Sequence, residues 1–600
     1  MSSVFSKLYD LLDRRERRLA WLLFALFVLS GLADLAGAAS ILPFLAAVAD
    51  PTTTSNQPML ATLRNWVGLA DNNSFLVFLG AIVLVIMLGT MMIRLLTVWA
   101  MAKFAYGQNY RISSRLLSAY LHQPYVWFLH RNAADLGRVV LNETELVVMQ
   151  VLLPAMRLVS NTVTILCLIA LLVAVNPTVA LSTSLVLGGA YALISILVRK
   201  VMARSASERA NANHLRYRLA QEALTGIKDL KILGAEESYS ARYSAAARRF
   251  TDSGSTATTV GETPRHVLET LAFGGMVVLV LALLVTGSGS LSQILPTLGV
   301  FAFAGMRIFP ALQQIYLSLT FIRSVRPMLD NLHRDVRETL GSRTAPHAEA
   351  AGRPRLALTR ELRLTDVHYA YPEAKRAALQ GIDLAIAARS TVGLVGGSGA
   401  GKTTAVDVLL GLLQPQSGGI LVDGQPVTRD NLRQWQNNIG YVPQEIFLID
   451  GTIAENIALG VPREAIDLAA VERAARTARL HDFVLAELPQ GYDTPIGDRG
   501  LRLSGGQRQR IGIARALYHD PDVLVLDEAT SALDNITEQA FIEAVHALGG
   551  QKTVIMIAHR LSTVQDCDTI FLMEQGKVAA SGRYDTLVAE NETFRQMARA

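Results

Sequence analysis

Cysteine is almost absent from this 600-residue chain, which contains only Cys167 and Cys567. With one cysteine in each half, a framework of disulfide bonds is excluded. The formal net charge of +5 is small for this length and argues against nucleic acid as a partner. No internal repeat is visible. No small-residue cleavage site follows the basic N-terminus and its long apolar run, so we expect this run to remain as a membrane span.

Long apolar runs fill the first half of the chain. Six of them have at least roughly the 20 residues that a helix needs to cross a bilayer. The spans are expected at residues 19–48, 74–101, 150–175, 178–198, 267–286 and 291–322. Eleven Lys and Arg residues lie within 199–250, whereas the loop 51–73 contains only Arg64. The positive-inside rule therefore places both chain ends in the cytoplasm.

A linker and a soluble domain follow the spans. Residues 341–356 are small, proline or charged and show no apolar period, which is typical of a linker. We expect them to join a membrane domain at 1–340 to a domain at 357–600. Alternation of apolar and polar residues begins at Leu362–Val367, and the second domain reads as an α/β fold. Between spans two and three, and four and five, polar helical stretches should extend the membrane domain into the cytoplasm.

A phosphate-binding loop follows an apolar strand expected at Thr391–Val395. It reads GGSGAGKT and opens a helix expected at Thr403–Leu412, which is the context that this motif requires. Glycines allow the backbone N–H groups to point at phosphate oxygens, near the positive end of the helix. In such loops the lysine contacts the β- and γ-phosphates and the following hydroxyl binds Mg²⁺. The candidate ATP ligands are Gly396, Ser398, Gly399, Gly401, Lys402, Thr403 and Thr404.

A second apolar strand, expected at 523–526, leads into Asp527 and Glu528. The stretch Leu503–Gln507, which reads LSGGQ, lies 20 residues before this strand. Together with the phosphate-binding loop upstream, these motifs resemble those of the ATP-binding-cassette (ABC) ATPases. The arrangement of the whole chain resembles an ABC exporter half-transporter, in which one membrane domain is fused to one ATPase.

The resemblance assigns roles to residues around the phosphates and implies ATP and Mg²⁺ as cofactors. Ser504, Gly506 and Gln507 would cap the ATP held by a second cassette, so a homodimer with two complete sites is expected. The resemblance implies three catalytic residues: Glu528 (general base), His559 (switch histidine) and Gln444 (metal and water contact). It also implies the Mg²⁺ ligands Thr403, Gln444 and Asp527. Asp534 would lie in the loop that crosses the dimer interface.

Further assignments depend on the same resemblance. Tyr371 is the candidate for stacking on adenine, although Tyr369 competes with it and either could belong to the core. Residues 494–500, which include Asp498, resemble the exporter-specific loop that touches the coupling helices. Candidates for those coupling helices are Pro124–Asn132 and Ala220–Gly234, at the turns of the two cytoplasmic extensions.

Five ionisable residues interrupt the apolar spans or their edges: Asp34, Arg94, Arg157, Arg265 and Arg307. A charge in hydrocarbon costs at least ~2.5 kcal/mol, so such residues are candidates for substrate contact. Some of these arginines could instead extend to the headgroups of the inner leaflet. If Arg94, Arg265 and Arg307 line a shared cavity, their guanidinium groups would select an anionic substrate such as a phosphate or pyrophosphate.

The arginines, with Arg307–Pro310 and the amphipathic segment 58–69, resemble the ABC flippases of lipid-linked oligosaccharides, which carry a short external helix between the first two spans. The resemblance predicts ATP-driven flipping of a phosphorylated lipid-linked oligosaccharide across the cytoplasmic membrane, with the lipid bilayer and this anionic amphiphile as partners. One alternative is an exporter of another lipid, a drug or a peptide. The other is a non-transporting ATP-gated channel or regulator, which intact Glu528 and His559 disfavour.

Overall fold

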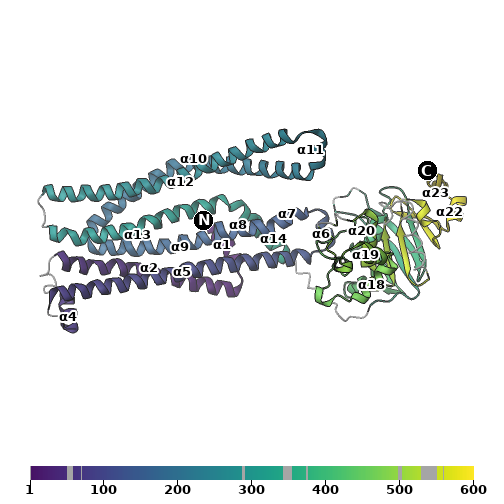
Figure 1. Cartoon of the computed structure of the whole chain (residues 1–600), viewed down its shortest axis with the longest axis horizontal. Coiled ribbons are helices and arrows are strands. Elements are labelled where there is room, and N and C mark those ends of the chain that lie inside the picture. The colour runs from purple at the N-terminus through teal and green to yellow at the C-terminus, as the bar shows by residue number, and fades with distance from the viewer. Residues whose placement is uncertain are drawn as a thin grey trace. The chain divides into compact units, whose positions relative to one another are not determined.

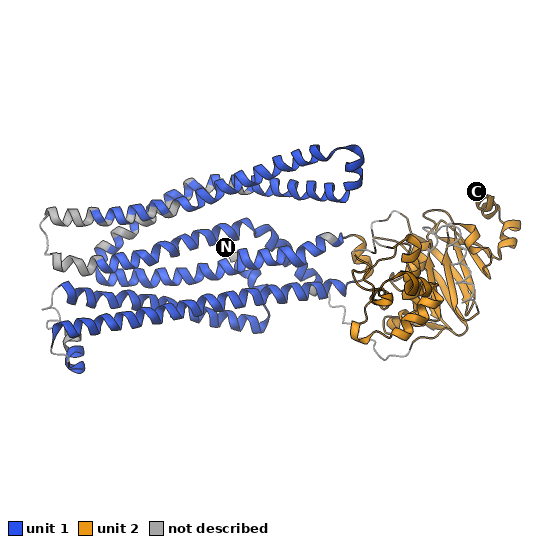
Figure 2. Ribbon diagram, in the orientation of Figure 1, with its two compact units in different colours: residues 1–123, 131–343 blue, residues 124–130, 344–600 orange. Residues whose placement is uncertain are grey.

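The chain divides into two compact units. The computed structural model describes residues 2–49, 58–68, 71–286, 291–341, 355–372, 374, 376–497, 500, 503–528, 550–558 and 560–599. The first unit holds residues 1–123 and 131–343, and the second holds 124–130 and 344–600 (Figure 2). The linker expected at 341–356 falls mostly outside the described residues.

The first unit is helical throughout its described part, as Figure 1 shows. Short π-helical turns at Val139–Glu143 and Val148–Leu152 connect the pieces that precede α9. The helices are α1 (Ser2–Leu11), α2 (Arg14–Ala49), α4 (Pro58–Val67), α5 (Asn72–Leu121), α7 (Ala133–Arg138), α8 (Thr144–Val147), α9 (Leu153–Val175), α10 (Pro177–Thr225), α11 (Ile227–Leu233), α12 (Glu236–Thr286), α13 (Leu291–Ser324) and α14 (Arg326–Gly341).

Among the described residues, four helical segments are long and apolar enough to cross a membrane: Arg14–Ala49, Asn72–Leu121, Asp135–Val175 and Gly299–Ser324. The first three contain the first, second and third expected spans, and Gly299–Ser324 covers most of the sixth, which is expected at 291–322. The fourth and fifth expected spans fall within α10 and α12. At 1.5 Å per residue, the 50 residues of α5 measure about 75 Å, far more than the ~30 Å of a hydrocarbon core. The predicted helical extensions beyond the bilayer therefore follow from helix length alone.

Helix α2 is central to the packing of the first unit, because it contacts α5, α9 and α13. Two of its glycines allow close approach. A Cβ atom on Gly31 would lie 2.9 Å from a methyl carbon of Val163 on α9, and one on Gly37 would lie 3.3 Å from the hydroxyl of Thr90 on α5. Helices α10 and α12 pair along their length as an antiparallel hairpin that turns at α11 (Figure 1).

The amphipathic segment expected at 58–69 forms α4. Leu63 packs against a small cluster around Phe75, whereas Trp66 is exposed. The two turn regions expected to carry coupling helices also contain short helices, α6 (Tyr125–Leu129) and α11. Helix α6 belongs to the second compact unit, where Val126 packs against the apolar core.

The second unit is an α/β domain with two sheets. An antiparallel sheet has the order β2-β1-β4-β5, and a six-stranded sheet has the order β10-β9-β3-β8-β7-β6. The strands are β1 (Glu361–Tyr369), β2 (Leu379–Ala387), β3 (Thr391–Val395), β4 (Ser417–Val422), β5 (Gln425–Pro426), β6 (Ile439–Val442), β7 (Val523–Asp527), β8 (Thr553–Ile557), β9 (Thr569–Glu574) and β10 (Lys577–Gly582).

In the six-stranded sheet, β6, β7, β8, β3 and β9 run parallel, and β10 pairs antiparallel with β9. Every residue of β3, β7 and β8 is buried, as expected for parallel strands covered on both faces. The carboxyl ends of parallel strands meet at one edge of a sheet, which is where ligands bind in such folds. The predicted phosphate loop follows β3, and Asp527 is the last residue of β7, so both lie at this edge.

The described helices of the second unit surround these sheets (Figure 1). They are α6, α15 (Lys402–Leu409), α16 (Leu432–Gln436), α17 (Ile453–Ile457), α18 (Leu468–Thr477), α19 (His481–Glu487), α20 (Gly505–Leu517), α22 (Tyr584–Glu590) and α23 (Glu592–Arg599), with 3₁₀ turns at Arg463–Ala465, Gly491–Asp493 and Leu561–Val564. The predicted order of a helical membrane region followed by an α/β domain is confirmed.

Candidate nucleotide site and membrane charges

The loop between β3 and α15 has the backbone of a phosphate cradle. Gly396 and Gly401 have φ of 148° and 101°, a region that favours glycine. A Cβ atom at Gly396 would lie 2.2 Å from the carbonyl oxygen of Met573, so a side chain there would clash. Ser398 and Gly399 are exposed at the turn of the loop. The loop is therefore built so that its backbone, rather than its side chains, faces a ligand.

Lys402 is the first residue of α15, and its ammonium group reaches back over the loop. Its Nζ donates to the carbonyl oxygens of Gly396 at 2.8 Å and Gly397 at 3.2 Å. Burial lowers the pKa of Lys402, and the nearby carboxylates of Glu528 and Asp527 act in the opposite direction. Thr403, next to it, is exposed at the N-terminus of the helix. This arrangement suits contact of Lys402 and Thr403 with phosphate and a divalent cation.

The two acidic residues at the end of β7 have different environments. Asp527 is buried at the end of the strand, and the hydroxyl of Tyr441 donates to its Oδ2 at 3.3 Å. Glu528 has φ of 48°, which costs a non-glycine residue roughly 1–2 kcal/mol. Its backbone N–H donates to the carbonyl oxygen of Ile557 on β8 at 3.1 Å. Strained backbone of this kind is common at functional sites, because the surrounding fold must hold it in place.

The side chains of Gln444 and Glu528 meet in the structure. Strands β6 and β7 are parallel neighbours, with Val442 opposite Leu526, so the residues two positions further along come close together. Gln444 donates from Nε2 to Oε2 of Glu528 at 2.6 Å. Because its amide nitrogen faces the carboxylate, the glutamine orients the group that the resemblance assigns as general base.

The two candidate tyrosines for adenine occupy different positions. Tyr369 is 4% exposed and belongs to the core, whereas Tyr371 is half-buried. The rings meet edge to face with their centroids 5.1 Å apart. The hydroxyls of Tyr371 and Thr404 lie 3.2 Å apart, which connects Tyr371 to the helix after the phosphate loop. Thr404 is buried, so it supports the loop from behind.

Ser504 and Gln507 form the N-terminal cap of α20. Gln507 donates its backbone N–H to the Ser504 hydroxyl at 3.2 Å, and the backbone N–H of Ser504 donates to Oε1 of Gln507 at 2.8 Å. This reciprocal capping box fixes the start of the helix. The amides of the first turn and the positive end of the helix dipole suit an anion, and Gly506 leaves them accessible.

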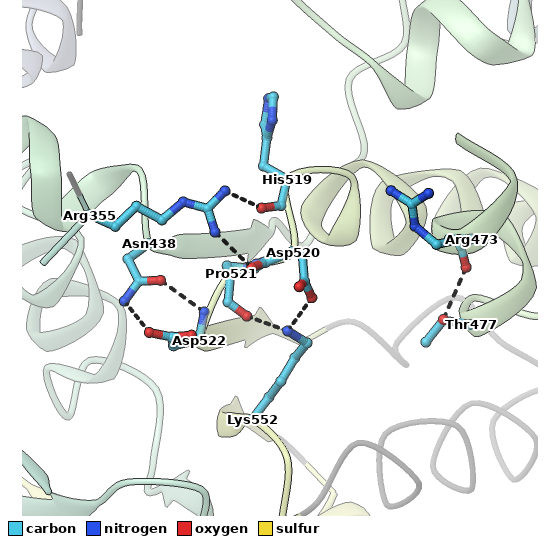
Figure 3. Close-up of polar contacts among 9 residues, drawn as sticks. All are labelled: Arg355, Asn438, Arg473, Thr477, His519, Asp520, Pro521, Asp522 and Lys552. Atoms are coloured by element: carbon cyan, nitrogen blue, oxygen red, sulfur yellow. Dashed lines mark hydrogen bonds and ion pairs between the residues drawn. The ribbon is translucent and has the colours of Figure 1, made fainter. Parts of the chain in front are cut away.

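Contacts along α20, which sequence reasoning missed, fix its position in the domain. Arg515 donates to backbone carbonyls of Phe447 and Asn456, in the segment that follows Gln444. Just beyond the end of α20, Arg355 donates to the carbonyl oxygens of His519 and Asp520 (Figure 3). The LSGGQ helix is therefore connected to the segment that follows Gln444, and the residues just after it are connected to Arg355 near the end of the expected linker.

Several predicted site residues lie outside the described residues: Asp498, Asp534 and His559. Arg265 lies on α12, but its side chain is not among those that the structure describes. The side chain of Arg157 is exposed on α9. The assignments for these residues stay predictions.

Arg94 and Asp34 form an ion pair, although they lie 60 residues apart in the sequence. Nε of Arg94 lies 3.0 Å from Oδ1 of Asp34, and Nη2 donates to Oδ2 at 3.0 Å. The hydroxyl of Thr164 on α9 donates to the same Oδ2 at 3.4 Å. Arg307 on α13 is half-buried, and the charges of Arg94 and Asp34 both act on it. Three of the five membrane charges therefore share one region.

Comparison with known proteins defines the class. Residues 379–531 match the family described as ABC transporter, and residues 20–307 match the ABC transporter transmembrane region. The chain is 32% identical over 505 residues to an ATP-dependent lipid A-core flippase of Cupriavidus metallidurans, covering 83% of this chain and 82% of that protein. It belongs to the ABC transporter family, as an exporter with fused membrane and ATPase domains.

Other relatives differ in their named cargo. An ATM1-type heavy metal exporter of Novosphingobium aromaticivorans is 35% identical over 384 residues, which is 63% of this chain and 61% of that protein. The solved structure of a bacterial Atm1-family ABC exporter with ATP bound is similar with a TM-score of 0.70 and 26% identity, and 98% of each chain is covered. The protein is thus an ATPase coupled to translocation, and the family leaves its substrate open.

Proposed function

We propose that this transporter uses ATP hydrolysis to flip an anionic amphiphile, a lipid-linked oligosaccharide with a phosphorylated headgroup, across the cytoplasmic membrane. The observation that carries this proposal is Arg307. It lies in an apolar segment of α13, with its guanidinium carbon 5.6 Å from the centroid of the Phe303 ring. Among the described residues, no carboxylate lies within ion-pair distance of Arg307. A guanidinium in this environment suits a phosphate, which it binds through paired N–H donors.

Two further features support a lipid substrate. Helix α4, between the first two spans, has Leu63 packed inward and Trp66 exposed, which suits a helix at the membrane interface. Several relatives, including the one from Cupriavidus metallidurans, are named as flippases of a lipid. We infer that α4 lies on the outer surface, near the emerging lipid.

The ATPase site fits ATP with Mg²⁺. The donor set of the Thr403 hydroxyl, the Asp527 carboxylate and the Gln444 carbonyl consists of the hard oxygen ligands that Mg²⁺ prefers. Gln444 turns its amide nitrogen toward Glu528, which leaves its carbonyl oxygen as an acceptor. Bound Mg²⁺ would neutralise phosphate charge during transfer. Glu528 would orient and deprotonate the attacking water, accepting the proton at its carboxylate.

We infer that two copies of the chain form the working transporter, because Ser504, Gly506 and Gln507 would complete the ATP site of a partner. The turn between α10 and α12 also exposes large apolar side chains: Leu224, Ile232 and Leu233 are each more than 70% exposed. Beside them lies a mostly apolar groove of about 360 Å³, lined by residues such as Leu219, Ile227 and Tyr243. Such a patch favours burial against another protein surface, and a second copy would provide one.

The test is translocation of a polyprenyl-pyrophosphate glycan in proteoliposomes. Arg307→Ala should abolish translocation while basal ATPase activity persists, because the change leaves the nucleotide site untouched. Arg307→Lys should retain part of the activity, since it keeps the charge but not the paired donors. Met306→Ala is the matched control, because Met306 is exposed on the same helix turn. Full translocation by Arg307→Ala would refute the anionic-headgroup proposal.

A second candidate is export of a soluble compound, which the Atm1-type relatives favour. The same preparation separates the two. A lipid flippase is stimulated by amphiphiles incorporated in the bilayer, whereas an exporter of a soluble compound responds to water-soluble solutes added on the ATPase side. Stimulation by solutes alone would favour the second candidate.

A further inference from the structure

Asp34 is a carboxylate enclosed by three helices of the membrane domain. Its side chain is 1% exposed on α2, and it meets Arg94 from α5 and Thr164 from α9. Gly31 and Gly37, one turn away on each side, let α9 and α5 come close enough for these contacts. An ionised carboxylate in an apolar interior is costly unless it is paired, so Arg94 is the partner that makes Asp34 tolerable.

The pair is asymmetric. The side chain of Arg94 is 36% exposed, whereas that of Asp34 is sealed. Arg94 contacts Asp34 through Nε and Nη2, and among the described residues its Nη1 makes no hydrogen bond. A guanidinium has five N–H donors arranged as a planar fork. One face of Arg94 therefore holds Asp34, and the remaining donors stay accessible to an incoming anion.

The charges of this region do not add up to a purely cationic site. Asp34 neutralises one of the two arginines, Arg94 and Arg307, so the three described side chains carry a net charge of +1. The attraction that a headgroup feels is the sum of two cations and one fixed anion. The position of Asp34, rather than the arginines alone, then sets how strongly an anion is held.

We propose that Asp34 is a specificity-determining residue: a resident counter-anion that shares Arg94 with the substrate headgroup and keeps binding weak enough for release. This inference rests on the proposed function, because it assumes an anionic headgroup. A transporter must bind its cargo and then let it go, and a fixed carboxylate beside Arg94 offers the guanidinium an alternative partner when the headgroup leaves. Without that carboxylate the headgroup should be held more tightly and released more slowly.

The experiment uses the full-length chain in proteoliposomes, with polyprenyl pyrophosphate as the probe and the uncharged polyprenol of equal length as its control. In Asp34→Asn, the concentration of pyrophosphate lipid that half-maximally stimulates ATPase activity should fall about tenfold, which corresponds to ~1.4 kcal/mol. The response to polyprenol should stay as in the wild type. Translocation at saturating pyrophosphate lipid should be slower than in the wild type, because release becomes limiting.

Thr164→Val is the matched control, since it removes a hydrogen bond to Asp34 without changing charge. It should leave the half-maximal concentration unchanged. If Asp34 only holds the helices together, both variants would lose stability and neither would change the preference for the charged lipid over the neutral one. An unchanged half-maximal concentration in Asp34→Asn, or an equal shift for both lipids, would overturn the proposal.

A double variant covers the case in which Asp34→Asn does not fold. Asp34→Asn with Arg94→Gln removes both charges, and replacing a whole buried pair is generally better tolerated than breaking it. The proposal expects weaker stimulation by pyrophosphate lipid than in the wild type, because the Arg94 donors are lost. Equal stimulation would overturn it. If pyrophosphate lipid does not stimulate the ATPase activity of the wild type, which instead translocates another solute, the proposed function is wrong. This inference is then wrong with it.

Discussion

Asp407 on α15 gives a quantitative test of the electrostatics beneath the nucleotide site. Burial, and then the charge of Asp527, raises the pKa of the Asp407 carboxyl from 3.8 to about 6. The folded domain therefore binds this proton more tightly than the unfolded chain does. Its contribution to stability is complete below about pH 4 and is lost as the pH rises through 6. Above that pH the folded domain holds an ionised Asp407 carboxylate that is partly buried and repelled by the charge of Asp527.

The magnitude follows from the two pKa values. At roughly 1.4 kcal/mol per tenfold change in proton affinity, ionised Asp407 costs the fold up to about 3 kcal/mol at neutral pH. Partial exposure to solvent reduces this, so we expect about 1–3 kcal/mol. Asp407→Asn keeps the shape of the side chain and removes the charge. It should stabilise the nucleotide-free domain by that amount above pH 6 and have little effect near pH 4.

Hydrogen exchange of the full-length protein in nanodiscs is the assay, because local opening can be followed peptide by peptide. At pH 7.5 without nucleotide, amides of α15 and β7 should exchange about 5- to 100-fold more slowly in Asp407→Asn than in the wild type. Asp430→Asn, at an exposed position, is the control. Equal protection at pH 7.5, or lower protection in Asp407→Asn at every pH, would refute the reasoning.

Three further outcomes are expected. Glu528→Gln should reduce ATP hydrolysis at least about 100-fold, because a positioned general base contributes about 10²–10⁴-fold. Size-exclusion chromatography of this variant with ATP should show a persistent dimer. Near-normal turnover would exclude Glu528 as the base. Arg355→Ala should remove the two hydrogen bonds from Arg355 to the carbonyl oxygens of His519 and Asp520 (Figure 3) and lower the free energy of opening at the end of α20, measured by hydrogen exchange, by about 1–3 kcal/mol. Arg355→Lys should retain part of this protection. Burial raises the pKa of Asp423, but hydrogen bonds from Thr359 and from the backbone amides of Arg360 and Glu361 outweigh it and lower this pKa to about 2. The contribution of Asp423 to stability should therefore be lost as the pH falls from about 4 to 2. A melting temperature of Asp423→Asn that equals that of the wild type at every pH would contradict this.

Local sequence patterns were sufficient for the secondary structure around the phosphates. The helix expected at Thr403–Leu412 is α15, Lys402–Leu409, and the strand expected at Thr391–Val395 is β3. Both were predictable because a phosphate loop requires a strand before it and a helix after it. The contact between Gln444 and Glu528 was not predictable in the same way. It depends on which strands are neighbours in the sheet and on their register, and neither is encoded locally.

Membrane topology shows the same division. Apolar length predicted helices for all six spans, and the basic residues indicated an orientation, because transfer into hydrocarbon depends on composition. Arg94 and Asp34 were both recognised as intramembrane charges, but nothing in the sequence joined them. They lie on separate helices 60 residues apart, and only the packing of α2 against α5 brings them within 3.0 Å.

The sequence by itself determined the class of this protein: an exporter with an apolar membrane region fused to an ATPase whose motifs occur in order. These features depend on short stretches of chain, each of which carries its own chemistry. Only the tertiary structure decided which side chains pair with the charged groups of the membrane region and of the nucleotide site. It placed a carboxylate beside Arg94 and an amide beside Glu528, because side chains distant in sequence interact only after helices and strands have packed.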